Sequence, residues 1–450
     1  MGRSITSRRG PLPAPQVHAN DSSLTQFSGL VPFIRFLVDK LDIVSRLVRV
    51  APSDGRKLVF KRHLMLLTFM VGAVAGVERL DHLAWLRGDA VLLKFLRLPR
   101  WPVRKVFSQA LAGVTDRGIA ALQALIADVG LAPVRGRGRA VLDVDSSAIV
   151  AFGTQEGTCF GYSGKGRNRR RHHPLVASVA ETRAVVHADY RDGSAIDAEE
   201  AIAFVHRSLT VMRGVLSAGA EVILRADSGF WSNKMGAWLM DQEVPFIFSL
   251  PLRPGVKLML RATRWRGLDG DPDIQGTVIP GARLGMDHRL RVLGIRRRVF
   301  DDKEPPQGKR IEGCERWRYQ ALVTVMTGQP DDLWRFYNGR ADCERIFKVA
   351  RKALGMGRLV GQQLRANETA FLLRILAFNA DLRFQAHAQK RAAEAERPVI
   401  RMGLVARQRR FFNAAGRLLR THDRWVLRVR DNRVVERLWA FYAPDLLKVE

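Results

Sequence analysis

The apolar residues in the first third of the chain recur at helical spacing. From Ile34 to Leu47, and again in later stretches up to about residue 130, they return every three or four positions. Such spacing is typical of helices that bury one face, and strand-like alternation is scarce here. We therefore predict an all-helical region over residues 26–136, preceded by a flexible N-terminus at residues 1–25.

The longest apolar run within this region covers residues 64–77. It is interrupted by Thr68 and Gly72 and is shorter than the ~20 residues that a membrane span needs. We interpret the run as a buried helix, and we expect no membrane partner.

The hydrophobic pattern changes at Ala140. Residues 140–145 form a short apolar run with acids at alternate positions, which is typical of a strand. Further elements are predicted in alternation, with strands at 176–186 and 222–226 and helices at 198–216 and 231–240. This order indicates a mixed α/β domain whose first part covers residues 137–245.

Short apolar or alternating runs separated by Gly, Pro and Asp then follow, and they predict a β-rich insertion over residues 246–329. Pro330 and the two acids behind it are typical of a helix start. We predict that residues 330–390 complete the α/β domain, and that residues 391–450 form a basic helical C-terminal region. The predicted fold class is α/β, with a mixed sheet flanked by helices and interrupted by the insertion.

The net charge of the chain indicates what kind of molecule it binds. The chain has 74 Lys and Arg against 44 Asp and Glu, a formal net charge of +30. A GC-rich genome would account for the preference for Arg over Lys, but not for the net excess. Since the hydrophobic content of 47% argues against global disorder, we predict a folded protein that binds a polyanion, with DNA or RNA first.

Cysteine usage indicates the compartment. Cys159, Cys314 and Cys343 lie far apart and form no CxxC pair, which argues against a zinc ribbon or a disulfide framework. The basic N-terminus has no apolar segment behind it, so it does not resemble a signal peptide. We therefore expect a reducing, cytoplasmic location.

Two places on predicted strands carry candidate catalytic acids. Asp143 and Asp145 alternate on one strand and so point to the same face, where a core strand seldom carries two acids. Asp227 follows an apolar strand and precedes Ser228-Gly229, at the strand end where α/β sheets place their sites. Plainer interpretations remain, since either position could be a turn or a helix cap.

A third acid lies on a predicted late helix. At 100° per residue, one stripe of that helix carries a phenol, three cations and a single carboxylate: Tyr337, Arg340, Glu344, Lys348 and Arg351. A lone carboxylate among phosphate-binding groups suits a metal ligand that works on a nucleic-acid backbone. A surface pair between Glu344 and Lys348 is the plainer interpretation, and Gly339 could break the helix in two.

Each of these acids is a weak indication of function by itself, but the set of three is more informative. Asp on a strand, Asp at a second strand end and Glu on a late helix are what a two-metal phosphoryl-transfer site needs. Divalent cations such as magnesium take carboxylate oxygens as ligands, together with water and phosphate. We therefore treat the three acids as one candidate site.

The motifs around these acids resemble those of bacterial insertion-sequence DDE transposases of the insertion-sequence-thirteen-eighty group. The resemblance covers about residues 70 to 385 and is carried by the order of the motifs. These are Leu142-Asp-Val-Asp-Ser-Ser147, Gly161-Tyr162 with His173-Pro-Leu175, Arg225-Ala-Asp-Ser-Gly-Phe230, Phe336-Tyr-Asn-Gly-Arg-Ala341 with Glu344 and Lys348, and Asn367 with Ala377-Phe-Asn379.

The resemblance implies a ribonuclease-H-like core and assigns roles to its residues. Asp145 would be the first catalytic acid and metal ligand, with Asp143 as its rival, Asp227 the second and Glu344 the third, holding two Mg²⁺ or Mn²⁺ ions. The Tyr, Arg, Glu, Lys signature of the family would map to Tyr337, Arg340, Glu344 and Arg351, so an Arg stands at the Lys position. Lys348 or Lys352 could then supply the ammonium group.

The function that this resemblance implies is cut-and-paste DNA transposition. The partners would be double-stranded DNA, both terminal inverted repeats and target, and a second copy of the chain in a synaptic homodimer associated with the bacterial nucleoid. Two alternatives stay open. One is a catalytically inactive or domesticated DNA-binding protein, and the other is a structure-selective nuclease on the same fold.

Overall fold

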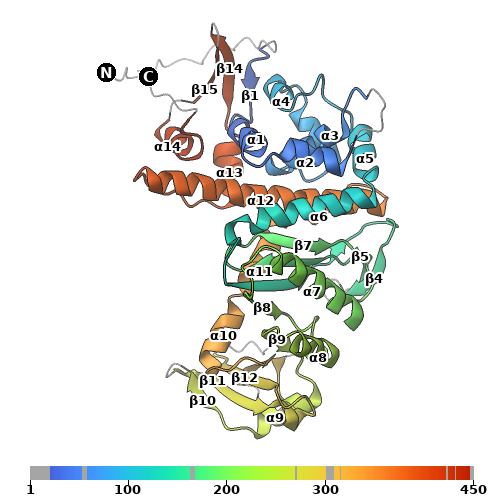
Figure 1. Cartoon of the computed structure of the whole chain (residues 1–450), viewed down its shortest axis with the longest axis vertical. Coiled ribbons are helices and arrows are strands. Elements are labelled where there is room, and N and C mark those ends of the chain that lie inside the picture. The colour runs from blue at the N-terminus through green and yellow to red at the C-terminus, as the bar shows by residue number, and fades with distance from the viewer. Residues whose placement is uncertain are drawn as a thin grey trace, which may run out of the picture.

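A computed structural model describes residues 21–52, 58–162, 168–268, 271–300, 309–314, 316–421, 424–430 and 432–445, without the side chains of 162 and 342–347. Figure 1 shows an elongated molecule. The N-terminal helices lie at one end, a large sheet lies in the middle, and a β-rich lobe lies at the other end. The long helix α12 (Leu364–Glu394) crosses the molecule between the N-terminal helices and the large sheet.

The N-terminal region is helical, as its apolar spacing predicts. Its elements are α1 (Leu30–Asp39), α2 (Ile43–Val50), α3 (Arg62–Val74), η1 (Leu80–Leu86), α4 (Ala90–Phe95), α5 (Arg104–Ala112), α6 (Asp116–Leu131) and η2 (Ala132–Val134). Helix α3 contains the longest apolar run, and every residue from Met65 to Val74 in it is buried. The interpretation of this run as a buried helix is confirmed.

Helix α6 is central to the packing. Among the described residues, the segment Asp116–Val134 is long and apolar enough to cross a membrane by length and composition. In this fold, however, α6 packs between α12 and strand β7. Its apolar side chains, including Leu122 and Ile126, are buried in that contact. The segment is therefore a core helix of the domain.

Nine of the strands that the structure describes form one mixed sheet. Its first half contains β2 (Arg139–Ser146), β6 (Leu175–Val179), β7 (Val185–Asp189), β8 (Glu221–Ala226) and β9 (Phe246–Leu250). They lie in the order β7-β6-β2-β8-β9, with β2, β8 and β9 parallel and β6 antiparallel to both its neighbours. This is the strand order of a ribonuclease-H-like sheet, so the predicted fold class is confirmed.

The β-rich lobe extends that same sheet. It contains α9 (Pro254–Ala262), β10 (Arg266–Leu268), β11 (Asp271–Pro280), η3 (Gly281–Leu284), β12 (Arg291–Arg298) and β13 (Trp317–Thr324). Strand β13 pairs with β9, which itself pairs in parallel with β8. The segment 246–250, which the sequence pattern places at the start of the insertion, is therefore the fifth core strand. Alternation alone does not tell a core strand from its neighbour in an insertion.

Two helices follow the lobe, α10 (Pro330–Asn338) and α11 (Ala341–Ala353), and α12 comes after them. A small separate sheet contains β3 (Ile149–Val150), β4 (Cys159–Tyr162) and β5 (Asn168–His172). Helix α7 (Ala198–Arg213) begins at a capping box between Asp197 and Glu200, and α8 (Asn233–Asp241) begins at Ser232. Both helices cover the sheet face opposite α11 and α12.

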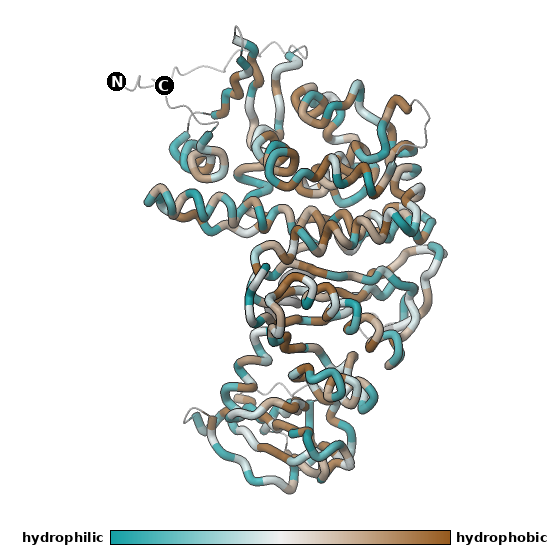
Figure 2. The backbone as a smooth tube through the Cα atoms, viewed as in Figure 1, coloured by the Kyte–Doolittle hydropathy of each residue, from teal (hydrophilic) through white to brown (hydrophobic). Residues whose placement is uncertain are grey.

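The C-terminal region differs from the helical prediction. It contains α13 (Leu404–Arg407), η5 (Gln408–Phe412), β14 (Gly416–Thr421), β15 (Arg424–Val429) and α14 (Arg433–Tyr442). Strand β14 also pairs with the short N-terminal strand β1 (Leu24–Thr25). Figure 2 shows apolar residues along the central strands and the helices that face them, so both chain ends join one core around α12.

Asn379 links three elements of this core. Its side chain accepts a hydrogen bond from the Val185 N–H of β7 at 3.0 Å and donates to the Val185 and Ile126 carbonyls. Asn379 itself is fully buried. One amide therefore joins α12 to the sheet and to α6, and this accounts for the Asn in the Ala377-Phe-Asn379 motif.

We expect Asn379→Ala to lower the free energy of unfolding by about 2 kcal/mol, because the buried N–H and C=O of Val185 lose their partner. Urea unfolding followed by circular dichroism measures the change. The control is Asn233→Ala on α8, where the side chain is exposed and the change should stay within about 0.5 kcal/mol. Equal losses in the two variants would contradict this role for Asn379.

Candidate functional site

The first two candidate acids lie side by side because β2 and β8 run parallel in register. Val144 pairs with Ala226, so Asp145 and Asp227 are the next residues on two neighbouring strands. Side chains alternate along a strand, and the preceding pair, Asp143 and Arg225, shares one face of the sheet. Asp145 therefore projects from that same face, at the carboxyl end of the parallel strands.

Asp143 is engaged in a structural ion pair. Its two oxygens accept from Arg225 Nε at 2.7 Å and Nη2 at 2.8 Å. The two residues are 1% and 4% exposed, and Arg225 also donates to the Phe336 carbonyl of α10. A buried carboxylate held at both oxygens by a guanidinium is poorly placed to bind an ion. This geometry gives Asp143 a structural role, and Asp145 as the first ligand stays a prediction.

Asp145 lies at the edge of a pocket and is 9% exposed. Its Oδ1 accepts from the Ser146 N–H at 3.0 Å and from Arg340 Nη2 at 2.9 Å. Arg340 is the residue that precedes α11, and it is 5% exposed. The helical stripe predicts that Arg340 binds phosphate. In this structure Arg340 contacts Asp145 directly.

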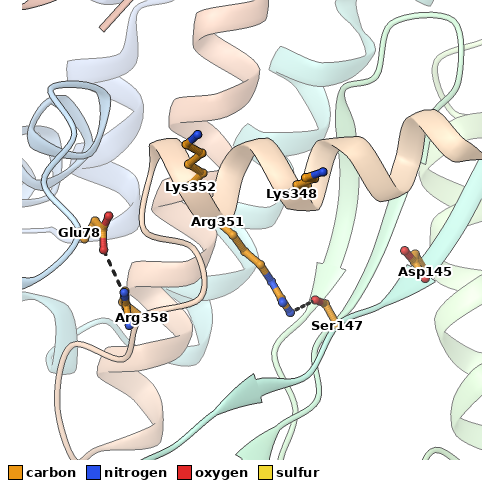
Figure 3. Close-up of a pocket in the computed structure, with 7 residues that line it drawn as sticks. All are labelled: Glu78, Asp145, Ser147, Lys348, Arg351, Lys352 and Arg358. Carbon is orange, nitrogen blue, oxygen red and sulfur yellow. Dashed lines mark hydrogen bonds and ion pairs between the residues drawn. The ribbon is translucent and has the colours of Figure 1, made fainter. Parts of the chain in front are cut away.

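Helix α11 crosses the carboxyl end of β2 (Figure 3). Arg340 at its start bonds Asp145, and Arg351 near its end donates to Ser147 Oγ and, at 2.7 Å, to the Ala148 carbonyl. Glu344 lies on α11 between these two residues and on the same helical stripe. Its side chain is outside the described residues, so its contacts are not part of this geometry.

The predicted stripe is divided at Gly339. Helix α10 ends at Asn338 and α11 begins at Ala341. Tyr337 lies on α10, where it is 7% exposed and packs in an apolar cluster with Ile247 of β9 and Leu333. Arg340, Lys348 and Arg351 thus gather at the pocket side of α11, while Tyr337 packs between α10 and the sheet.

The pocket beside Asp145 has a volume of about 560 Å³. It is lined by one hydroxyl, two acids and four cations, namely Ser147, Glu78, Asp145, Lys348, Arg351, Lys352 and Arg358. Glu78 pairs with Arg358 at 3.2 Å, whereas Lys348, Arg351 and Lys352 line up along α11 (Figure 3). Desolvation lowers the pKa of Arg351 and the Asp145 carboxylate opposes this shift. A lining in which four cations outnumber two acids suits an anionic ligand such as a phosphodiester.

His173 is a site residue that the strand and helix patterns did not single out. Its Nε2 lies 3.0 Å from Ser146 Oγ, beside Asp145. Desolvation and the neighbouring Arg171 lower the pKa of His173, and the Asp227 carboxylate works in the opposite direction. The His173-Pro-Leu175 motif was the signal in the sequence. By contrast, His172 is buried between the Tyr190 hydroxyl and the Glu156 carbonyl.

Asp227 is half-buried and accepts a hydrogen bond from the Gly229 N–H at 3.0 Å. This is the turn that the plainer interpretation expected, and it leaves the carboxylate at the strand end beside Asp145. Two carboxylates at neighbouring strand ends fit a hard divalent cation. Within the part of the chain whose side chains are described, no group of three His, Cys, Asp or Glu residues is placed to hold a metal. A third metal ligand would therefore have to come from another element, and the helix adjacent to β2 is α11.

Comparisons with known proteins give one family match. The model described as "Transposase DDE domain group 1" matches residues 16–263, which include Asp145 and Asp227 but end before Glu344. No curated protein matches the sequence.

Two solved structures are similar over part of the fold. One is a piggyBac transposase synaptic complex with hairpin DNA, with 10% identity, 86% of this chain and 80% of that chain covered, and a TM-score of 0.47. The other is a Drosophila P element transposase strand transfer complex, with 11% identity, 47% and 42% covered, and a TM-score of 0.22.

The two acids of β2 should differ in their effect on stability. Asp143→Asn leaves the buried Arg225 charge without its counter-ion, so we expect a loss of about 3–5 kcal/mol in the free energy of unfolding. Asp145→Asn should cost less, because an Asn side chain can still accept the bond from Arg340 Nη2 at Oδ1, whereas Asp143 holds Arg225 at both of its oxygens. Urea unfolding of the two variants tests this, and equal losses would contradict a purely structural role for Asp143.

Proposed function

This chain belongs to the family of group 1 transposase DDE domains, since the family model covers more than half of it, and we propose that it is an active cut-and-paste DNA transposase. The observation that carries the proposal is the position of Asp145 at the edge of the pocket beside α11, on a strand whose parallel neighbour leads directly into Asp227. A phosphodiester brought to this pocket would meet the Asp145 carboxylate and the cations of α11.

We assign the roles as follows. Asp145, Asp227 and Glu344 would hold two Mg²⁺ or Mn²⁺ ions, which when bound activate a water molecule and neutralise charge on the reacting phosphate. Lys348, Arg351 and Lys352 would bind the phosphates beside the scissile bond. Tyr337 would act through packing, by holding α10 against the sheet.

The reaction has two balanced steps. Water attacks a phosphodiester at the transposon end, the P–O3′ bond breaks, and the products are a 3′ hydroxyl and a 5′ phosphate. That 3′ hydroxyl then attacks a phosphodiester of a second strand, which forms one new P–O bond as another breaks. The protein residues supply position and charge compensation for both steps.

The partners follow from this reaction. We propose that residues 26–136 and the basic surfaces bind the terminal inverted repeats of a bacterial insertion sequence of the insertion-sequence-thirteen-eighty group. Synapsis of two DNA ends would require a homodimer near the nucleoid, and a hairpin could form on one of the cut ends. The net charge of +30 suits both end and target DNA.

The test needs the DNA that flanks the gene, because short inverted repeats there supply the substrate. The protein is incubated with an end-labelled repeat duplex, a target plasmid and Mg²⁺ or Mn²⁺. A transposase produces a nick at the repeat boundary and joined products. Cuts without joining would indicate a structure-selective nuclease, and a mobility shift without cuts would indicate an inactive or domesticated binding protein.

We expect Asp227→Asn and Glu344→Gln each to lower the cleavage rate by at least about 10²-fold, the scale of losing one charge-stabilising group in an active site. Binding of the repeat duplex, measured by fluorescence anisotropy, should persist, since the cations on α11 are retained. The matched control is Asp332→Asn, an exposed acid in the first turn of α10, which should cleave at the wild-type rate. Normal cleavage by Glu344→Gln would remove α11 from the proposed site.

A further inference from the structure

The three-stranded sheet β1-β14-β15 joins the two ends of the chain and has two different faces. Leu418 and Leu427 pair across β14 and β15 and pack with Val31, Val91 and Phe95 of the N-terminal helices. The residues that alternate with them point the other way, and Arg417, Arg424 and Arg428 on that face are exposed. The hairpin thus has an apolar inner face and a basic outer face.

Positive charge predominates on the two strands of this hairpin. The two six-residue strands, GRLLRT and RWVLRV, contain four arginines and no acid. Arg417 lies directly opposite Arg428 in the antiparallel register, and like charges in opposing positions destabilise a sheet. Asp21 pairs with Arg417 at 2.9 Å and offsets part of this repulsion. An arrangement that is unfavourable in the free protein becomes favourable when a polyanion covers it.

On the other face of the hairpin, the exposed Trp425 lies opposite Arg420 and contacts α4. Trp425 is 50% exposed, and Lys94 Nζ lies 3.3 Å from its ring centroid. The Arg420 guanidinium lies 5.9 Å from the same ring. These cation–π contacts hold two cations in fixed positions beside the hairpin, so the positive charge is organised as well as dense.

We propose that the outer face of the β14–β15 hairpin forms a second DNA-binding surface, which contacts the phosphate backbone of the duplex. The inference rests on the proposed function, because it takes the polyanion to be the DNA on which the transposase acts. Charge complementarity selects this occupant. A second copy of the same face would bring like charges together, and Arg417, Arg424 and Arg428 suit rows of phosphates, which Arg binds with two parallel hydrogen bonds.

This surface lies away from the candidate catalytic pocket. Figure 1 shows β14 and β15 on one side of α12 and the large sheet with α11 on the other. DNA that reaches both surfaces must therefore pass α12. The hairpin would add affinity to a long duplex without entering the reaction, so binding and cleavage should separate in variants of it.

The experiment measures binding to a long end-repeat duplex as a function of salt, by fluorescence anisotropy, with Arg424→Gln/Arg428→Gln in the full chain. Each lost phosphate contact lessens the slope of log K against log salt by about 0.9, so we expect a change of about 1.8. The charge-matched control is Arg213→Gln/Lys234→Gln on α7 and α8, which cover the face of the large sheet opposite α12. This variant should keep the wild-type slope.

The outcomes separate this inference from the proposed function. If the wild type cleaves and joins DNA and the hairpin variant binds with the wild-type slope, the hairpin surface is refuted and the transposase stands. If the wild type binds DNA but neither cleaves nor joins it, the proposed function fails, and the slope still decides the hairpin. Equal slope changes in the control variant would mean a general charge effect and would also refute the hairpin surface.

The stability of the single variant Arg428→Gln provides a second check. Removing one member of the like-charged pair should leave the melting temperature unchanged or slightly raised, while DNA affinity falls. Thermal unfolding and anisotropy on the same preparation measure both. A lower melting temperature with unchanged DNA affinity would show that Arg428 supports the sheet, and it would overturn the proposal.

Discussion

The geometry of the candidate site depends on the parallel pairing of β2 with β8 and on the Asp143–Arg225 ion pair that locks it. Both partners are buried, and both carboxylate oxygens are held. One residue beyond the adjacent pair Val144 and Ala226 lie Asp145, near the end of β2, and Asp227, directly after β8. A slip of one residue would turn Asp145 to the other face of the sheet, so the ion pair maintains the register on which the site depends.

The same ion pair connects the sheet to the helices that follow the insertion. Arg225 donates to the Phe336 carbonyl of α10, and a Cβ at Gly339 would lie only 2.7 Å from its Nη1. Glycine at 339 therefore makes room for the guanidinium where α10 ends. Arg340 and Arg351 then attach α11 to the end of β2. Thus residues more than a hundred positions apart are brought to one pocket by a few directional bonds.

Position within the fold separates residues that look alike in the sequence. Asp143 and Asp145 are two residues apart on one strand, yet one is sealed against Arg225 and the other borders the pocket. Tyr337 and Arg340 belong to one sequence motif, but the helix breaks between them at Gly339. Tyr337 therefore packs into an apolar cluster, whereas Arg340 contacts Asp145. Arginines divide in the same way, since Arg374 is fully buried and bonded to the Glu78 and Arg358 carbonyls, whereas those of β14 and β15 are exposed.

Apolar spacing was enough to identify the N-terminal helices, the buried run in α3 and the strand β2, because local periodicity reflects which face each element buries. Motif order was enough to indicate the ribonuclease-H-like class, while the choice of catalytic acids stays a prediction. It did not place 246–250 in the core sheet, find the β14–β15 hairpin or show that Asp143 pairs with Arg225. Those outcomes depend on which distant segment pairs with which, and a long-range partner such as Arg225 or β1 leaves no periodic signal near the residue that it contacts.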